Sequence, residues 1–285
     1  MKKFFALAMA LIMVLSLAAC GSKPAETPAE PETPVVEEPT LSTVAEGKLT
    51  VATSPDFAPY EFYAIAEDGT PSLAGFDVAL AGYIADYLGL ELDIIPMEFD
   101  GVLAELATGN VDLGMAGLSP DPDRMDAMDF SDIYYAGGQS FVSTQAKKDM
   151  FPNLDAANGD ITVAAQIGSI QMGLAEQFSA DADIVSLPKV TDIIAELISG
   201  KLDGAYIETA VAVSYAANYP ELYIVCDVPY DVEGSSVGVM KGNAELLAGV
   251  NEAIAAALAD GSMDQFVATA NEQASGNILE GLLDG

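Results

Sequence analysis

Arg124 is the only arginine in a chain that carries 44 Asp and Glu residues against 10 Lys and Arg residues. Its planar guanidinium can pair with a carboxylate through two parallel hydrogen bonds. The alternative is a surface ion pair with Asp121, Asp123 or Asp126, which would contribute only about 0–1 kcal/mol. In a closed cleft, each charge-assisted bond would contribute about 1.5–3 kcal/mol. We interpret Arg124 as a group that binds the carboxylate of another molecule.

Composition excludes several kinds of chemistry. The chain has no histidine, which removes imidazole acid–base catalysis, Ser–His and Cys–His nucleophile pairs, and histidine-ligated metals. A formal net charge of −34 disfavours nucleic acids and anionic lipid surfaces as partners, although it can also be a solubility or habitat trait. The aspartate run 121–132 lacks the glycine and the glutamate of an EF-hand loop, so it predicts a solvated acidic face. We expect no metal and no cofactor.

The first residues have the pattern of a secretory leader. Met1–Lys3 is basic, and residues 4–19 form an apolar run that is short for a membrane-spanning helix. The sequence Leu17-Ala-Ala-Cys20-Gly21 resembles the lipobox of bacterial lipoprotein signal peptides. This resemblance implies a signal peptide at 1–19, cleavage before Cys20 and lipidation of its thiol. An ordinary signal peptide with an incidental cysteine is the alternative.

Residues 20–46 interleave proline with glutamate and threonine and show no apolar periodicity, which predicts a disordered tether. With Cys20 acylated, Cys226 is the one remaining cysteine, so no intramolecular disulfide is expected. Cys226 lies in the apolar run 222–226, and we expect it to be a buried, inert thiol.

From Lys48 onward, short β-rich runs alternate with helical ones, which predicts parallel sheets covered by helices. The expected strands cover residues 49–53, 92–97, 111–117, 161–165, 184–187, 202–207 and 222–226. The expected helices cover residues 76–88, 102–108, 191–199 and 209–217, with another that begins near 170. The apolar face of the 76–88 helix comprises Phe76, Leu80, Tyr83, Ile84, Tyr87 and Leu88.

An internal echo indicates two similar lobes. Residues 106–112 and 197–203 share the frame Leu-x-x-Gly-x-apolar-Asp, in which glycine ends a helix and a strand follows. Such junctions are also common in unrelated proteins. In parallel sheets, ligands bind beyond the carboxyl ends of the strands, so residues 117–119 and Glu208 would face a shared cleft.

Seven motifs occur in order between residues 47 and 270. They are Asp-Phe-Ala-Pro-Tyr-Glu-Phe at 56–62, Gly-Phe-Asp-Val at 75–78, Phe-Asp-Gly at 99–101, Gly-Leu-Ser-Pro-Asp-Pro-Asp-Arg at 117–124, Asp-Phe-Ser-Asp at 129–132 with Tyr-Tyr at 134–135, Gln-Ile-Gly-Ser-Ile-Gln at 166–171, and Leu-Asp-Gly-Ala-Tyr-Ile-Glu at 202–208. Together they resemble the polar amino-acid-binding proteins of ABC importers, which are solute-binding proteins of family 3.

The resemblance implies an α/β, two-lobe periplasmic-binding-protein-like fold of type II, in which each lobe is a sheet flanked by helices. The first lobe would comprise residues 47–138 plus 236–285, and the second 139–235, with two hinge crossings near 136–140 and 234–237. The implied function is extracytoplasmic capture of a free amino acid and its delivery to an ABC permease. No bond chemistry is involved, and we expect a monomer that is anchored to the membrane by the lipid on Cys20.

Carried over residue by residue, the resemblance implies the ligand-binding residues Phe57, Phe99, Gly117, Ser119, Arg124, Ser169, Ile170, Gln171 and Glu208. Phe57 and Phe99 would sandwich the ligand side chain, although both residues could be ordinary core. Gly117 and Ser119 would supply polar contacts. Arg124 would hold the α-carboxylate. A second contact to this carboxylate would come from Ser169 and the amides that follow it at a helix start, and Glu208 would receive the α-ammonium.

The sequence departs from the family pattern at Asp121, where threonine is usual, and we expect this carboxylate to turn away toward solvent or Arg124. A second departure, Ala79 in place of an acidic residue, is expected to be a tolerated surface change. Asp56, Asp100 and the overall field favour a ligand with a polar or basic side chain. Two other functions remain open: a small-acid dehydratase that uses Glu208 or Asp121 as its acid–base group, and the binding lobe of a sensor.

Overall fold

The structure is a computed structural model, and it describes residues 41–65, 68–232 and 234–275. The predicted signal peptide, Cys20 and most of the predicted tether lie outside these residues. Across the three ranges, no helix has the length and apolarity needed to cross a membrane.

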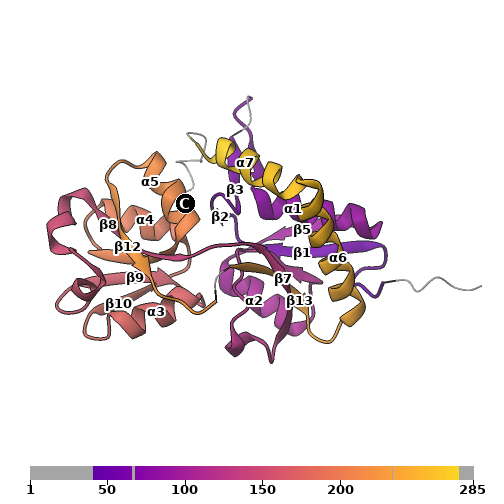
Figure 1. Cartoon of the computed structure of the whole chain (residues 1–285), viewed down its shortest axis with the longest axis horizontal. Coiled ribbons are helices and arrows are strands. Elements are labelled where there is room, and N and C mark those ends of the chain that lie inside the picture. Colours follow the sequence, from indigo (N-terminus) through magenta and orange to yellow (C-terminus); the bar gives the residue numbers. More distant parts are fainter. Residues whose placement is uncertain (1–40, 66–67, 233, 276–285) are drawn as a thin grey trace, which may run out of the picture. The chain divides into compact units, whose positions relative to one another are not determined.

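A first five-stranded sheet has the order β5-β1-β6-β13-β7. Its strands are β1 (Lys48–Thr53), β5 (Glu91–Pro96), β6 (Leu113–Gly114), β7 (Met128–Tyr135) and β13 (Ser235–Met240). The helices α1 (Phe76–Leu88), α6 (Ala244–Asp260) and α7 (Ser262–Ala274) pack together on one side of this sheet, and α2 (Phe99–Thr108) lies on the other side (Figure 1). We call these elements, with the small sheet described below, the first lobe.

Helix α1 forms at the residues that the sequence predicts, 76–88, and packs on the sheet through its apolar face. Phe76, Leu80 and Ile84 recur at helical spacing and are fully buried, so burial of this stripe drives α1 onto the sheet. Tyr87 was expected on the same face but is 48% exposed. The buried face of the helix includes Ala81 and Ala85 instead, so it is turned away from Tyr87. Gly89 ends the helix in the left-handed conformation, with φ +68°.

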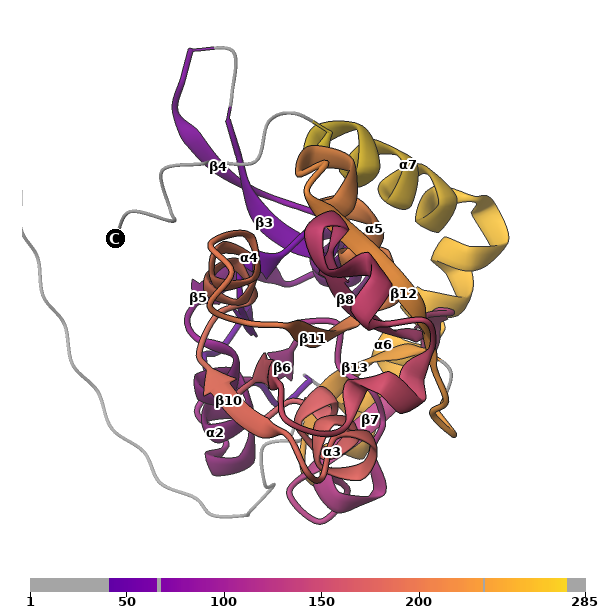
Figure 2. The ribbon, with the colours of Figure 1, turned by 90° about the vertical axis from the view of Figure 1, so that its left-hand side faces the viewer.

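A second five-stranded sheet has the order β10-β9-β11-β8-β12. Its strands are β8 (Gln139–Thr144), β9 (Thr162–Gln166), β10 (Asp183–Leu187), β11 (Gly204–Glu208) and β12 (Leu222–Val228). Figure 2 shows α4 (Val190–Ile198) and α5 (Thr209–Asn218) on one side of it and α3 (Ile170–Phe178) on the other. With the 3₁₀ turns Gln145–Met150 and Leu154–Ala157, these elements form the second lobe.

The small sheet β2-β3-β4 was not expected from the sequence. It comprises β2 (Asp56–Phe57), β3 (Glu61–Ile65) and β4 (Pro71–Ala74), all antiparallel. Also unanticipated were β7, β8, β13, α6 and α7. The expected strand 111–117 is reduced to Leu113–Gly114, after which the chain turns into the loop that carries Gly117.

The expectation of purely parallel sheets is wrong. Strand β13 runs antiparallel to both of its neighbours, β6 and β7, in the first sheet, and β8 runs antiparallel to both of its neighbours, β11 and β12, in the second. The physical reason is the route of the chain. Residues 136–138 lead directly from β7 into β8, and 229–232 followed by Gly234 lead from β12 into β13, so β8 and β13 enter their sheets without a crossover helix.

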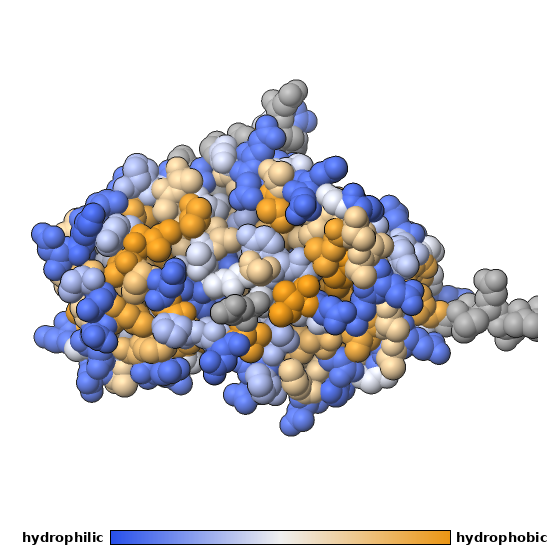
Figure 3. All heavy atoms as spheres, viewed as in Figure 1, coloured by the Kyte–Doolittle hydropathy of each residue, from blue (hydrophilic) through white to orange (hydrophobic). Residues whose placement is uncertain are grey.

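The acid excess of the chain faces solvent for the most part. Figure 3 shows hydrophilic residues spread over the visible face. Among the described residues, the ion pairs are Lys48–Glu91, Lys147–Asp203, Lys201–Glu196 and Lys241–Asp129. Cys226 is a free thiol and only half-buried, at the edge of the second lobe's core, so the expectation of full burial is wrong; its burial still raises the pKa of the thiol.

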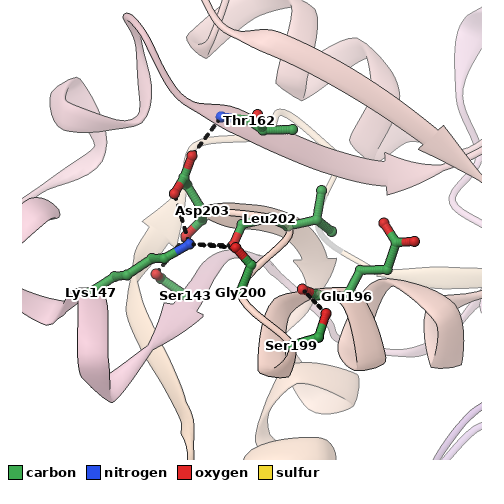
Figure 4. A network of polar contacts seen from close by, with 8 residues as sticks. All are labelled: Ser143, Lys147, Thr162, Glu196, Ser199, Gly200, Leu202 and Asp203. Carbon is green, nitrogen blue, oxygen red and sulfur yellow. Dashed lines mark hydrogen bonds and ion pairs between the residues drawn. The ribbon is translucent and has the colours of Figure 1, made fainter.

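The two lobes are built alike at the internal echo. Asp112 in the first lobe accepts the amide of Thr50 on β1 at 2.8 Å, and Asp203 in the second accepts the amide of Thr162 on β9 at 2.8 Å. Figure 4 shows how Lys147 completes the second arrangement, with Nζ donating to Asp203 and to the carbonyl oxygen of Leu202. Each aspartate therefore joins the helix–glycine junction to the neighbouring strand.

We expect Asp112→Ala to lower the free energy of unfolding by about 2–4 kcal/mol, measured by urea denaturation. Asp112 is fully buried and accepts two backbone amides, those of Val44 and Thr50, which would be left without an acceptor. The control is Asp93→Ala, which removes an exposed acid from β5 of the same lobe. Equal urea midpoints for the two variants would contradict the role given to Asp112.

Candidate ligand-binding site

One small cavity is lined by residues of both lobes. Its lining comprises Phe57, Phe99, Ala116, Gly117, Ser119, Arg124, Gln166, Ser169, Ile170 and Gln171. The free space between these side chains is about 10 Å³, roughly the room of one water molecule. A molecule larger than water can therefore enter only if the lobes or these side chains move apart.

The first-lobe wall depends on a glycine. Gly117 has φ +57°, and a Cβ atom added there would lie 2.7 Å from Cε1 of Phe57. Only glycine allows the loop after β6 to approach the Phe57 ring this closely. Phe57 on β2 and Phe99 at the start of α2 are 8% and 7% exposed, so both rings border the cavity from largely buried positions.

Asp77 holds this loop in place. It is fully buried in the first turn of α1, where its Oδ2 accepts the amide of Gly117 at 3.0 Å and its Oδ1 accepts the Tyr134 hydroxyl at 2.6 Å. Burial raises its pKa to about 6, and the two donors oppose that shift. The motif Gly-Phe-Asp-Val thus carries a residue that supports the cavity from beneath, a role that sequence reasoning did not assign.

Glu61 lies beside Asp77 and is also fully buried. Neither of its carboxyl oxygens has a donor among the described residues. Burial, followed by the charge of Asp77, holds the pKa of Glu61 well above its usual range. The raised pKa favours the protonated form of Glu61, which can donate a hydrogen bond to Asp77.

Arg124 reaches across to the second lobe. Its guanidinium donates to the carbonyl oxygen of Ser119 at 3.3 Å and to that of Gly168 at 3.0 Å, and its Cζ lies 5.7 Å from the centre of the Phe99 ring. Burial lowers the pKa of the guanidinium. The guanidinium nevertheless stays charged, because the usual pKa of arginine lies far above neutral pH. Within the described residues, no ion pair joins Arg124 to an aspartate, so the surface-bridge alternative does not describe this arrangement.

Asp121 does not line the cavity, as expected. Its carboxylate is not simply directed to solvent or to Arg124, because it accepts two hydrogen bonds from other residues. Its Oδ1 caps the short turn Pro122–Arg124 by accepting the amide of Asp123 at 2.8 Å. Its Oδ2 accepts the hydroxyl of Tyr230, on the connection between β12 and β13, at 3.2 Å. Asp121 therefore fixes the turn that carries Arg124.

The start of α3 forms the second-lobe wall. Ser169 precedes the helix, and its Oγ donates to the carbonyl oxygen of Gln166 at 2.7 Å instead of capping the helix amides. Gln171 donates to the side chain of Gln139 at 2.8 Å. The uncapped amides of a helix start attract anions, so this wall and Arg124 present two carboxylate-binding groups to one cavity.

Glu208 does not line the cavity. It ends β11 and is 3% exposed; its Oε2 accepts the amide of Val211 at 2.9 Å, and its Oε1 has no partner among the described residues. Burial raises its pKa to about 7. A Cβ atom on Gly137 would lie 2.7 Å from Oε1, so Gly137 in the connection between the lobes leaves that oxygen free.

Of the residues expected around a ligand, all those from Phe57 to Gln171 line the cavity, whereas Glu208 does not. Ala116 and Gln166 were missed, although Gln166 opens the motif that supplied Ser169 and Gln171. Asp56 and Asp100, which were expected to favour a basic ligand, do not line it. Asp56 instead accepts hydrogen bonds from the second lobe, and Asp100 is exposed.

The arrangement is suited to binding rather than to bond chemistry. A guanidinium and a helix start can hold a carboxylate, while a buried carboxylate with a free oxygen can receive a cation. Across the described ranges, no group of three or more acidic or thiol side chains is placed to hold a metal ion.

Comparison with known proteins points in the same direction. The chain is 30% identical over 259 residues to the arginine-binding extracellular protein ArtP of Bacillus subtilis, covering 89% of this chain and 92% of that protein. Its fold matches the amino acid ABC transporter substrate-binding protein AbpA of Streptococcus pneumoniae bound to L-arginine, with TM-score 0.77, 32% identity, and coverage of 81% and 97%.

A third similar structure is the ancestral amino acid-binding protein AncCDT-1, a precursor of cyclohexadienyl dehydratase, with TM-score 0.69, 28% identity, and coverage of 78% and 94%. The family model of the bacterial extracellular solute-binding proteins, family 3, matches residues 49–270. The match spans both lobes and every residue of the cavity, and the chain therefore belongs to the bacterial extracellular solute-binding proteins of family 3.

Proposed function

We propose that this protein captures a free amino acid outside the cytoplasm and delivers it to an ABC importer. The observation that carries the proposal is one cavity lined by Arg124 from the first lobe and by the start of α3 from the second, together with the buried carboxyl group of Glu208 in the second lobe. These groups match the α-carboxylate and the α-ammonium that every free amino acid presents. The arginine-binding extracellular protein ArtP and the amino acid ABC transporter substrate-binding protein AbpA support the same function.

We further propose that the ligand carries a cationic side chain. Asp77 contacts the lining residue Gly117, and Glu208 is a further buried acid of the second lobe, whereas Arg124 is the one basic residue in the lining. A second positive charge would offset part of this excess. The similar proteins that bind arginine support this ligand class.

Titration calorimetry against the free amino acids tests both proposals. We expect binding of arginine, lysine or histidine and weak or no binding of glutamate and leucine. At a ligand concentration 100 times its dissociation constant, folding should be stabilised by about 2.7 kcal/mol in a thermal melt. Binding of apolar or acidic amino acids alone would refute the cationic preference, and binding of no amino acid would refute the function.

With the amino acid identified, Arg124→Gln should weaken its binding by about 2–5 kcal/mol, which is more than thirtyfold at the low end. The substitution keeps a planar donor but removes the charge that would pair with the carboxylate. The melting temperature of the unliganded protein should change little. A decarboxylated analogue such as agmatine provides the control, because its affinity should be nearly the same for both proteins. Wild-type affinity of Arg124→Gln for the amino acid itself would contradict the role of Arg124.

Glu208 makes binding dependent on pH. Its pKa of about 7 in the unliganded site means that it is partly protonated at neutral pH, whereas an α-ammonium requires the carboxylate. Binding should therefore release a proton below pH 7. As the pH is lowered below 7, affinity should fall by up to about tenfold per pH unit, and above pH 7 it should not depend on pH. The number of protons released on binding is measured by repeating the titration calorimetry in buffers of different ionisation enthalpy. Glu208→Gln should bind more weakly and release no proton.

We propose that the lipid on Cys20 anchors the protein to the outer face of the cell membrane. The support is the lipobox-like sequence before Cys20 and the proline-rich stretch behind it. Cys20→Ser should move the protein from the membrane fraction to the soluble fraction. Its affinity for the amino acid should not change, because the folded residues lie beyond the tether. A membrane-bound Cys20→Ser protein would contradict the anchor.

An enzymatic role has less support in the site. Asp121 is engaged with Tyr230 and the amide of Asp123, so it is not free to act as an acid–base group. Glu208 remains as the one candidate, and its free oxygen matches an ammonium without any further catalytic group. We therefore propose that the protein binds its ligand without converting it.

A further inference from the structure

Asp56 is almost fully buried between the lobes, at 8% exposure, although it does not border the ligand cavity. It lies on β2 of the first lobe. Its Oδ2 accepts the backbone amide of Val190 at 2.6 Å and Nε2 of Gln166 at 3.1 Å, and both donors belong to the second lobe. Its Oδ1 accepts the hydroxyl of Ser54 at 2.8 Å.

The backbone of Asp56 makes a further contact between the lobes. Its carbonyl oxygen accepts the hydroxyl of Tyr215, on α5, at 2.9 Å, and Tyr215 is itself buried. One first-lobe residue thus holds donors from β9, α4 and α5. These three donors all belong to the second lobe, so a separation of the lobes would break these bonds.

The electrostatics suit this position. Val190 is the first residue of α4, a nine-residue helix, and its amide is one of the free donors of the helix start. Lys189 precedes it and attracts the carboxylate, while Glu61 is a nearby acid and Tyr215 a nearby hydroxyl. Burial raises the pKa of Asp56 to about 6, so it is ionised above pH 7.

We propose that Asp56 is a closure residue: its carboxylate grips the start of α4 when the cleft is shut, and so strengthens amino-acid binding without touching the amino acid. This inference rests on the proposed function, since it assumes that the lobes close over a ligand. In energetic terms, the free energy of the Asp56 bonds adds to that of the ligand contacts, because both are made in the closed arrangement alone.

Two single variants act on the same bond from opposite sides. Asp56→Asn removes the charge and leaves only a neutral amide oxygen as acceptor, which weakens the bond. Val190→Pro removes the amide while keeping Asp56, and proline is tolerated here because the first helical position needs no intrahelical donor and Lys189 is extended, with ψ 141°. Val190→Ala is the control for lost packing, because it keeps the amide. Asp100→Asn is the control for lost charge, since Asp100 is an exposed acid on α2.

At pH 8, we expect Asp56→Asn and Val190→Pro each to weaken binding of the amino acid about tenfold or more, mainly through faster dissociation. The double variant should bind the amino acid no more weakly than the weaker-binding single variant, because both substitutions act on the same bond. The two controls should bind within about threefold of the wild type. Circular dichroism melts verify that each variant is folded.

Wild-type affinity of Asp56→Asn would overturn the proposal. So would additive effects in the double variant, or weakened binding in Asp56→Asn together with unchanged binding in Val190→Pro, because Asp56 would then act through its charge alone. Should the wild type bind no amino acid, small-angle scattering of the unliganded protein still decides. An increased radius of gyration in both Asp56→Asn and Val190→Pro supports the grip, and unchanged radii overturn it.

Discussion

A carboxylate that is removed from water needs hydrogen-bond donors, and this protein supplies them mainly from its backbone. Asp112 accepts an amide of β1 and Asp203 an amide of β9, and Asp77 accepts the amide of Gly117. Glu208 accepts the amide of Val211 and Asp56 that of Val190. Backbone amides are fixed by the fold, so each buried acid is also a constraint on the loop or helix start that it contacts.

The ligand site is a consequence of these constraints. Asp77 fixes Gly117, which allows Phe57 to border the cavity, and Asp121 fixes the turn that carries Arg124. The site therefore combines one cation, Arg124, with carboxylates that accept backbone amides. Oε1 of Glu208 has no partner among the described residues, so a bound ammonium would supply it with a donor.

The proposed closure would be coupled to binding through two separate contacts. Arg124 reaches the carbonyl oxygen of Gly168 in the second lobe, and Asp56 reaches the amide of Val190. The first contact competes with a ligand carboxylate for the guanidinium, whereas the second leaves the cavity untouched. A bound amino acid could displace the Arg124 contact and still benefit from the Asp56 contact.

Local patterns determined much of this fold. The helical spacing of Phe76, Leu80 and Ile84 predicted α1, and the two Leu-x-x-Gly-x-apolar-Asp frames predicted lobes that are built alike. The ordered motifs predicted residues that line one cavity, because spacing within a motif preserves which side chains share a loop. The reduced strand at Leu113–Gly114 and the reversed strands β8 and β13 did not follow from such patterns, since strand direction depends on the route between the sheets.

The role of Asp56 was decided by tertiary structure alone. The sequence placed an acid next to Phe57 and suggested that it faces the ligand, whereas the fold brings to it the start of a helix 134 residues further along the chain. Likewise, Asp121 found its partner in Tyr230, 109 residues away. Composition and motifs specify which chemical groups a chain carries and which neighbours share a loop. Only the packing of distant elements decides which donor a buried acid meets, because that pairing depends on contacts between segments far apart in sequence.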